Sequence, residues 1–200
     1  TQLLGAFNDN LFKNAMVLYV IYSVYQSEEQ GGTFSAIASA VFILPFFVLS
    51  ALAGQLADMR DKAAIIRVVK LCEIGIMLVG GAGLFFAWQG NAIETLAIPL
   101  MLLALFAMGV HSTFFGPIKY AILPQHLARE QVLSGTGLIE AGTYIAILAG
   151  TVLAGWISVE ASAVCVIVFA VLGYLSSRHV PPAPPQDTPA RICRLLRGST

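Results

Sequence analysis

The chain alternates long apolar stretches with short polar segments, and each apolar stretch is about as long as a membrane-spanning helix. A spanning helix needs about 20 mostly apolar residues. Six stretches reach that length: Gln2 to Tyr25, Phe34 to Ala57, Ala64 to Trp88, Glu94 to Phe115, Glu130 to Ile157 and Val159 to Ser177. They leave almost no room for a soluble domain within 200 residues. The pattern therefore predicts an all-α membrane protein with six transmembrane helices.

Composition supports this assignment. Hydrophobic residues make up 58% of the chain and charged residues 11%, with a mean hydropathy of +0.81, whereas a soluble domain has about 25% charged residues. The first apolar stretch is longer than the 7–15 residues of a signal-peptide core and is followed by further spans. We therefore interpret it as part of the fold.

The distribution of charge predicts the orientation of the spans. The segments that follow the second and fourth spans, together with the tail, hold ten of the eleven basic residues: Arg60, Lys62, Arg67, Lys70, Lys119, Arg129, Arg178, Arg191, Arg194 and Arg197. The opposite loops contain no Lys or Arg. By the positive-inside rule both termini are cytoplasmic, and only Lys13 is expected deep within a span. The basic side can contact anionic membrane lipids, and nothing else in the sequence favours nucleic-acid binding.

From residue 180 the composition changes. Five prolines between Val180 and Pro189 favour an extended spacer. The sequence thus predicts a six-span transmembrane half-domain over residues 1–179 and a cytoplasmic, Pro-rich and basic linker over residues 180–200. Three spans followed by three spans place the second set in the opposite orientation, as in transporters built from two inverted three-helix repeats.

A polar group interrupts the first span in the stretch NDNLFKN. Asp9 and Lys13 are four residues apart and share one helix face, with Asn10 and Asn14 beside them. An ionisable side chain at membrane depth costs about 2.5–3.5 kcal/mol on insertion scales and normally faces a bundle interior or a cavity. Two interpretations stay open: an internal ion pair that helps the bundle to pack, or the wall of a polar cavity.

Further polar residues lie at similar depths in other spans. At 1.5 Å per residue, Asp9 and Glu140 both lie about 25 Å from the outer ends of their spans. Lys119 follows Gly116 and Pro117, which are expected to interrupt the helix, so it should lie at the cytoplasmic mouth. Glu140 can equally be a structural acid and Lys119 a snorkelling interface lysine. Glu73 and His111, in the third and fourth spans, are either proton-linked or hydrogen-bonded packing residues.

The loop after the second span carries a recognisable motif. GQLADMRDK, residues 54–62, resembles the major facilitator motif at this loop, matching it at Gly54, Leu56, Ala57, Asp58 and Lys62. Gly54 would let a neighbouring helix approach closely, and Asp58 would interact with the N-terminal dipole of the third span. Met59 and Asp61 depart from the motif. The resemblance implies one half of a major facilitator fold, with Gly54, Asp58, Arg60 and Lys62 in a gating loop; the alternative is a solvated connecting loop.

Three more segments narrow the resemblance. QLLGAFNDN (residues 2–10), FGPIKYAIL (115–123) and GLIEAGTYIAILAGTVLAG (137–155) resemble the lysophospholipid transporters of bacterial inner membranes. The resemblance implies transport of lyso-phosphatidylethanolamine to the cytoplasmic leaflet. It also implies a C-terminal six-span half of the same transporter, an acyltransferase/acyl-ACP synthetase, fused or separate, and no cofactor.

In that setting the polar residues acquire candidate roles. The zwitterionic head of a phospholipid would find an acid in Asp9 or Glu140 and a base in Lys13 or Lys119, and Asn10 adjoins them. The sequence shows no nucleophile–base constellation, phosphate loop or metal-ligand cluster, so we expect a transporter segment and not an enzyme. Two other functions stay open: a proton-coupled antiporter of small molecules or drugs, and a membrane domain that only tethers an enzyme.

Overall fold

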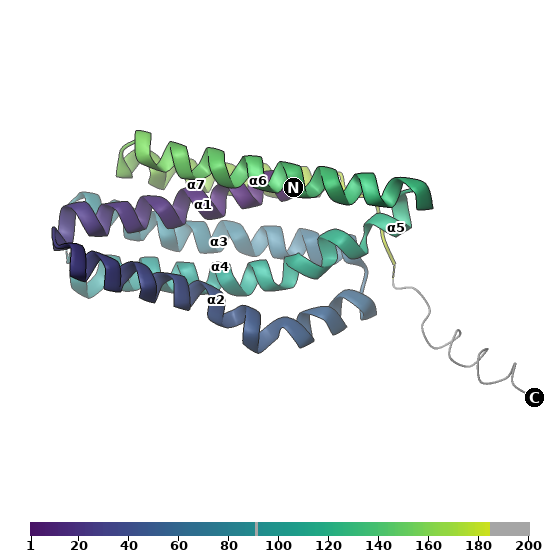
Figure 1. Ribbon diagram of the computed structural model, residues 1–200, viewed down its shortest axis with the longest axis horizontal. Helices are drawn as coiled ribbons and strands as arrows, with labels where there is room; N and C mark the ends of the chain where they lie inside the picture. Colours follow the sequence, from purple (N-terminus) through teal and green to yellow (C-terminus); the bar gives the residue numbers. More distant parts are fainter. Residues whose placement is uncertain (91, 185–200) are drawn as a thin grey trace, which may run out of the picture.

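The computed structural model describes residues 1–90 and 92–184, which are helical almost throughout and contain no strand. Figure 1 shows long helices lying side by side in one bundle. In chain order the elements are α1 (Gln2–Tyr19), η1 (Val20–Tyr25), α2 (Glu28–Met59), α3 (Lys62–Trp88), η2 (Ile93–Ala97), α4 (Ile98–Ala121), α5 (Leu123–His126), η3 (Arg129–Gln131), α6 (Val132–Trp156) and α7 (Val159–Ser177). The elements η1 and η2 are π-helical turns. The predicted all-α class is confirmed.

Four stretches within the described residues are long and apolar enough to cross a membrane. They are Glu29–Met59, Ile93–His126, Arg129–Trp156 and Val159–Ser177. The two other long helices, α1 and α3, carry Asn8, Lys70 and Glu73, which are fully or almost fully buried inside the bundle. The chain is thus a helical membrane protein, while the count of six spans stays a prediction.

The helices run back and forth between the two ends of the bundle (Figure 1). α1 packs mainly against α6, α2 against α4, and α3 against both α7 and α4. The turns α2–α3 and α4–α6 and the exit from α7 lie at one end. Arg60, Lys62, Arg129 and Arg178 belong to these connections. The basic residues of these connections therefore lie together at one end of the bundle.

Two glycines set how closely the helices cross. A Cβ at Gly109 would clash with the backbone carbonyl of Phe42 and touch the ring of Pro45 on α2. A Cβ at Gly150 would lie 2.5 Å from the backbone oxygen of Phe7 on α1. Small residues let membrane helices approach at backbone distance, so α2 against α4 and α1 against α6 pack at separations that only glycine permits.

The turn between α2 and α3 corrects the interpretation of the motif. Asp58 is exposed within the last turn of α2, and it is Asp61 that caps α3. Its Oδ1 accepts hydrogen bonds from the backbone N–H groups of Ala63 (2.8 Å) and Ala64 (3.1 Å). Asp58 was expected to interact with the N-terminal dipole of this helix, but α2 continues to Met59, and of the two acids it is Asp61 that has the extended backbone of an N-cap residue.

The other motif residues also differ from expectation. A Cβ at Gly54 would meet nothing within 4 Å among the described residues, so no described helix approaches closely there. Arg60 is exposed. Lys62 is only 4% exposed, which disagrees with the alternative of a solvated connecting loop at this position. The first turn of α3 is therefore buried by a segment that the sequence pattern did not place beside it.

That segment is the exit from α7. The backbone N–H of Lys62 donates to the carbonyl of Ala183 (2.9 Å), and the N–H of Ala183 donates to Asp61 Oδ1 (3.3 Å). The Arg67 guanidinium donates to the carbonyl of Val180 (2.9 Å). Ala183 is buried. The start of the predicted linker thus packs on the bundle, whereas its residues 185–200 lie outside the described part of the chain.

Replacing Asp61 with alanine should lower the free energy of unfolding by about 1 kcal/mol, since N-cap losses cost about 0.5–2 kcal/mol. Burial raises the pKa of Asp61, but the N–H groups of Ala64, Ala183 and Ala63 and the charge of Arg67 outweigh it, and the pKa lies below its ordinary value. A lowered folded-state pKa stabilises the fold above the unfolded-state pKa of about 3.9, and the contribution is lost as the pH falls through the folded-state pKa.

The measurement is unfolding in detergent at neutral pH and below about pH 3.9. We expect the gap between the wild type and Asp61→Ala to narrow on acidification. Asp61→Asn is the matched control, because asparagine caps helices about as well as aspartate. An equal loss for both variants would show that the charge, and not the cap, stabilises this turn.

Candidate functional site

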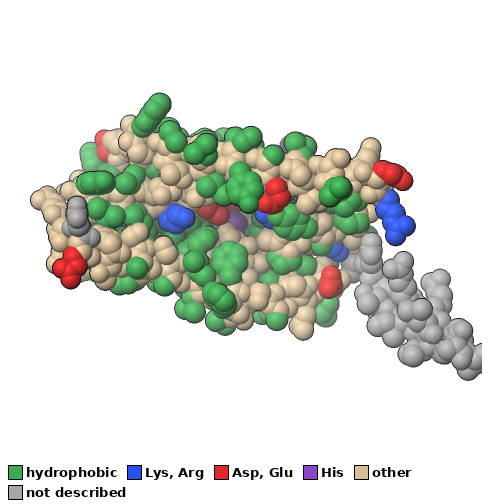
Figure 2. All heavy atoms as spheres, in the orientation of Figure 1, with side chains coloured by type: hydrophobic (Ala, Val, Ile, Leu, Met, Phe, Trp, Pro, Cys, Tyr) green, Lys and Arg blue, Asp and Glu red, His purple; other side chains and the backbone are tan. Residues whose placement is uncertain are grey.

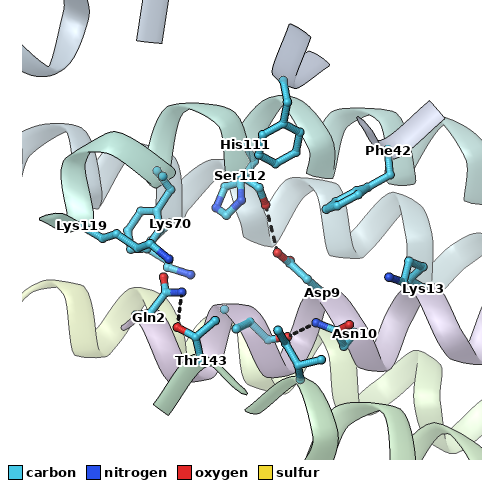
Figure 3. A pocket seen from close by; sticks show the side chains of 16 residues that line it. Gln2, Asp9, Asn10, Lys13, Phe42, Lys70, His111, Ser112, Lys119 and Thr143 are labelled. Carbon is cyan, nitrogen blue, oxygen red and sulfur yellow. Dashed lines mark hydrogen bonds between the residues drawn. The ribbon is translucent and has the colours of Figure 1, made fainter. Parts of the chain in front are cut away.

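A polar cavity opens between α1, α2, α4 and α6. Its volume is about 360 Å³, and Figure 3 shows the side chains that surround it. Figure 2 shows basic, acidic and histidine side chains gathered in a hollow between apolar ridges on this face of the bundle. The lining residues are Gln2, Gly5, Ala6, Asp9, Asn10, Lys13, Phe42, Phe46, Lys70, His111, Ser112, Phe115, Gly116, Lys119, Thr143 and Ile147.

The structure brings together most of the residues that the sequence selected. Asp9, Asn10, Lys13 and Lys119 all line this cavity, although Lys119 lies more than a hundred residues from the other three. Glu140 does not line it. Glu140 accepts a hydrogen bond from the Tyr120 hydroxyl, and its Oε1 lies 3.6 Å from Lys119 Nζ. Glu140 is therefore connected to the cavity only by its contact with Lys119.

The helix around Lys119 is continuous. α4 runs from Ile98 to Ala121 and includes Pro117, so the expected interruption at Gly116 and Pro117 is wrong. Proline inside a membrane helix removes one backbone hydrogen bond but is tolerated where neighbouring groups compensate. Lys119 consequently lies on the same helix face as His111 and Phe115, at four-residue spacing.

Asp9 and Lys13 turn in different directions (Figure 3). Asp9 Oδ2 accepts a hydrogen bond from Ser112 Oγ on α4 (3.0 Å), and its buried Oδ1 has no hydrogen-bond partner among the described residues. Lys13 Nζ lies 5.8 Å from the centre of the Phe42 ring on α2. No Asp9–Lys13 ion pair forms between these two described residues. The interpretation as an internal ion pair is therefore wrong.

The neighbouring amides bond to their own helix. Asn10 donates to the carbonyl of Ala6 and Asn14 to that of Asn10, both at 2.8 Å. Asn14 also donates to Thr151 Oγ1 on α6 (3.1 Å). Such back-bonding satisfies the amide N–H groups without a ligand. Asn10 therefore offers the cavity mainly its side-chain carbonyl oxygen.

A second charged group adjoins the cavity; the sequence selected its Glu73 and His111 but missed its Lys70. Lys70 Nζ is 2.5 Å from Glu73 Oε2, and both side chains are 1% exposed. Asn8 Nδ2 donates to Glu73 Oε1 (3.3 Å), and His111 Nε2 lies 3.4 Å from Glu73 Oε2. Lys70 was grouped with the bases of the cytoplasmic side, and its burial inside the bundle was not predicted. The three-residue spacing of Lys70 and Glu73 on one helix face was the available signal.

The residues around the cavity thus carry opposite charges, and some of these charged groups have partners while others do not. Lys70 forms an ion pair with Glu73. Lys119 lines the cavity and also contacts Glu140. Asp9 keeps one oxygen without a partner, and Lys13 has no acid partner among the described residues. Such a cavity can hold a small molecule that carries both a positive and a negative group.

Comparison with known proteins finds relatives that cover most of this chain. The lysophospholipid transporter LplT of Serratia proteamaculans is 29% identical over 187 residues, covering 92% of this chain and 42% of that protein. Transporters of the same name from Yersinia pestis and Yersinia pseudotuberculosis are 29% identical over 174 residues. The chain is thus similar to lysophospholipid transporters over most of its length. The resemblance found in its motifs is thereby confirmed.

The similarity covers one part of those relatives. The chain spans about two fifths of the length of the curated lysophospholipid transporters that it matches. No family model and no solved structure matches it. The relatives carry the name of a transporter and not of an enzyme, which agrees with the expectation of a transporter segment.

Proposed function

We propose that this chain forms one half of a transporter that moves lysophospholipid across a bacterial inner membrane to the cytoplasmic leaflet, with lyso-phosphatidylethanolamine as the substrate. The observation that carries the proposal is the similarity to lysophospholipid transporters over 92% of the chain. The polar cavity supports it, because this segment supplies both an acid and bases for a zwitterionic head group.

The free groups of the cavity suggest how the head group is held. The Oδ1 of Asp9 accepts a hydrogen bond from the substrate ammonium, and Lys13 and Lys119 donate to the phosphate. Asn10 lies beside Asp9 and accepts from the same ammonium. Glu140 competes with the phosphate for Lys119 and so favours release at the cytoplasmic end.

The openness of the cavity supports a second half. Charged groups facing hydrocarbon are costly, so a polar cavity must be covered by protein or filled with water. The relatives are more than twice as long as the matched segment. We propose that a C-terminal six-span half covers the face between α2 and α6, completing a fold of inverted three-helix repeats.

The exposed Asp58 and Arg60, with Gly54 and Lys62, then belong to a gating loop. An acyltransferase/acyl-ACP synthetase, fused or separate, consumes the product.

Transport by the full-length protein in vesicles tests the proposal. Labelled lyso-phosphatidylethanolamine should cross the membrane faster than in vesicles without protein, while a cationic drug should not. The buried Glu73 and His111 and the partly buried Asp9 favour one competing function, a proton-coupled antiporter. Drug movement that depends on a pH gradient, without lipid movement, would establish that function instead. If neither compound moved, the remaining function would be that of a membrane domain that only tethers an enzyme.

Orientation is tested by single cysteines introduced in a background from which Cys72, Cys165 and Cys193 are removed. We expect a membrane-impermeant reagent added outside the cell to label Glu29→Cys and to spare Asp58→Cys, because the basic end of the bundle is cytoplasmic. Both positions should label after the membrane is permeabilised. If a reagent added outside the cell labelled only position 58, the orientation of the helices would be the opposite of the one proposed.

A further inference from the structure

His111 is a buried side chain in the wall of the polar cavity, and its Nδ1 has no hydrogen-bond partner among the described residues. The residue is 6% exposed, and its other ring nitrogen, Nε2, lies 3.4 Å from Glu73 Oε2. Its ring is parallel to that of Phe115, with the ring centres 6.3 Å apart. A buried polar group without a partner is rare because it loses hydration without compensation, so the environment of His111 points to a ligand that completes it.

Glu73 determines which hydrogen bond His111 can offer. Its Oε2 lies 3.4 Å from His111 Nε2, while the carboxylate is also held by Lys70 and Asn8. A carboxylate only accepts hydrogen bonds, so its charge favours the proton on Nε2 and leaves Nδ1 of the neutral ring as an acceptor. His111 therefore has an acceptor, Nδ1, that lacks a donor among the described residues.

The groups of a lysophospholipid differ in their ability to supply that donor. The phosphate only accepts hydrogen bonds. The ammonium donates, but the charged Asp9 is the stronger partner for it. The remaining donor is the glycerol hydroxyl that a single-chain phospholipid has free and a two-chain phospholipid has esterified. Ser112, the residue after His111, donates to Asp9, so the two subsites come from one turn of α4.

We propose that His111 recognises the free glycerol hydroxyl of the substrate, so that the cavity selects single-chain over two-chain phospholipids by a hydrogen bond as well as by size. This inference rests on the proposed function and deepens it. His111 is then a specificity-determining residue, and Glu73 is the residue that positions its ring.

The test compares two lipids in the full-length protein reconstituted in vesicles. One is lyso-phosphatidylethanolamine, and the other is its analogue with hydrogen in place of the free glycerol hydroxyl. Wild type should transport the hydroxyl lipid at least fivefold faster at limiting concentration, since one neutral hydrogen bond contributes about 1 kcal/mol. His111→Phe keeps an aromatic ring and loses both nitrogens, and it should transport the two lipids at rates within twofold of each other.

Two further variants separate recognition from structure. His111→Gln keeps a side-chain acceptor and should keep part of the preference. Thr113→Val removes a buried hydroxyl from the same helix, one that bonds the carbonyl of Gly109 and does not line the cavity, and it should keep the full preference. Because each preference is a ratio within one variant, lower abundance or partial misfolding does not change it.

The outcomes are distinguishable. Equal transport of the two lipids by wild type overturns the hydroxyl subsite and leaves the proposed function intact. A preference that survives in His111→Phe overturns the assignment to His111. Transport of neither lipid by wild type overturns the proposed function, and this inference with it.

Discussion

Replacing Glu73 with glutamine should lower the free energy of unfolding by about 3–5 kcal/mol, the range observed when one partner of a buried ion pair is removed. Lys70 is fully buried, and its Nζ lies 2.5 Å from Glu73 Oε2, so the substitution leaves a cation inside the bundle without its anion. Chemical unfolding of the purified protein in detergent micelles measures the effect.

Two controls accompany this prediction. Glu94→Gln removes an exposed acid from the far end of the bundle and should change the unfolding free energy by less than about 0.5 kcal/mol. Lys70→Met combined with Glu73→Gln removes both charges and should recover most of the loss, since apolar replacements of buried pairs are often neutral. A loss below about 1 kcal/mol for Glu73→Gln alone would mean that Lys70 reaches water through the cavity.

Asp9→Asn should reduce lysophospholipid transport at least tenfold, which requires a loss of only about 1.4 kcal/mol of transition-state stabilisation. The variant keeps the shape of the side chain and an oxygen that can accept from Ser112, but it removes the charge that pairs with the substrate ammonium. Uptake is measured at matched abundance in the membrane.

The comparison variants separate charge from structure. Ser112→Ala removes a hydrogen bond to Asp9 and keeps the carboxylate, so it should cost less than Asp9→Asn. Asp9→Asn combined with Lys13→Met should stay inactive, because the two side chains form no ion pair that a double replacement could relieve. Full uptake by the double variant would contradict a role of Asp9 in substrate binding.

The sequence predicted the parts of this molecule that depend on periodicity. Apolar runs long enough to span a membrane predicted the helices, and four-residue spacing placed Asp9 and Lys13 on one face of α1. The spacing did not predict where the side chains turn, because that depends on neighbours from other helices. Ser112 on α4 attracts Asp9, while Lys13 lies over Phe42 on α2.

The features that were missed depend on contacts between distant segments. Lys70 was grouped with the cytoplasmic bases because it lies near the start of its span, and only the packing of α3 against α4 and α7 shows that it is buried. Asp58 was expected to interact with the start of α3 because the second span was predicted to end at Ala57, two residues before the end of α2. A boundary shift of that size is invisible to hydropathy, yet it decides which carboxylate meets the helix start.

The hydrogen bonds of Ala183 have a mechanical consequence. Its amide and carbonyl are held by Asp61 and Lys62, at the first turn of α3. A pull on the chain beyond Pro184 is therefore resisted first by these two hydrogen bonds and then by the hydrogen bond from Arg67 to Val180, before it reaches α7. Tension from any attached domain would load α3, the helix that carries Lys70 and Glu73 two to three turns further along.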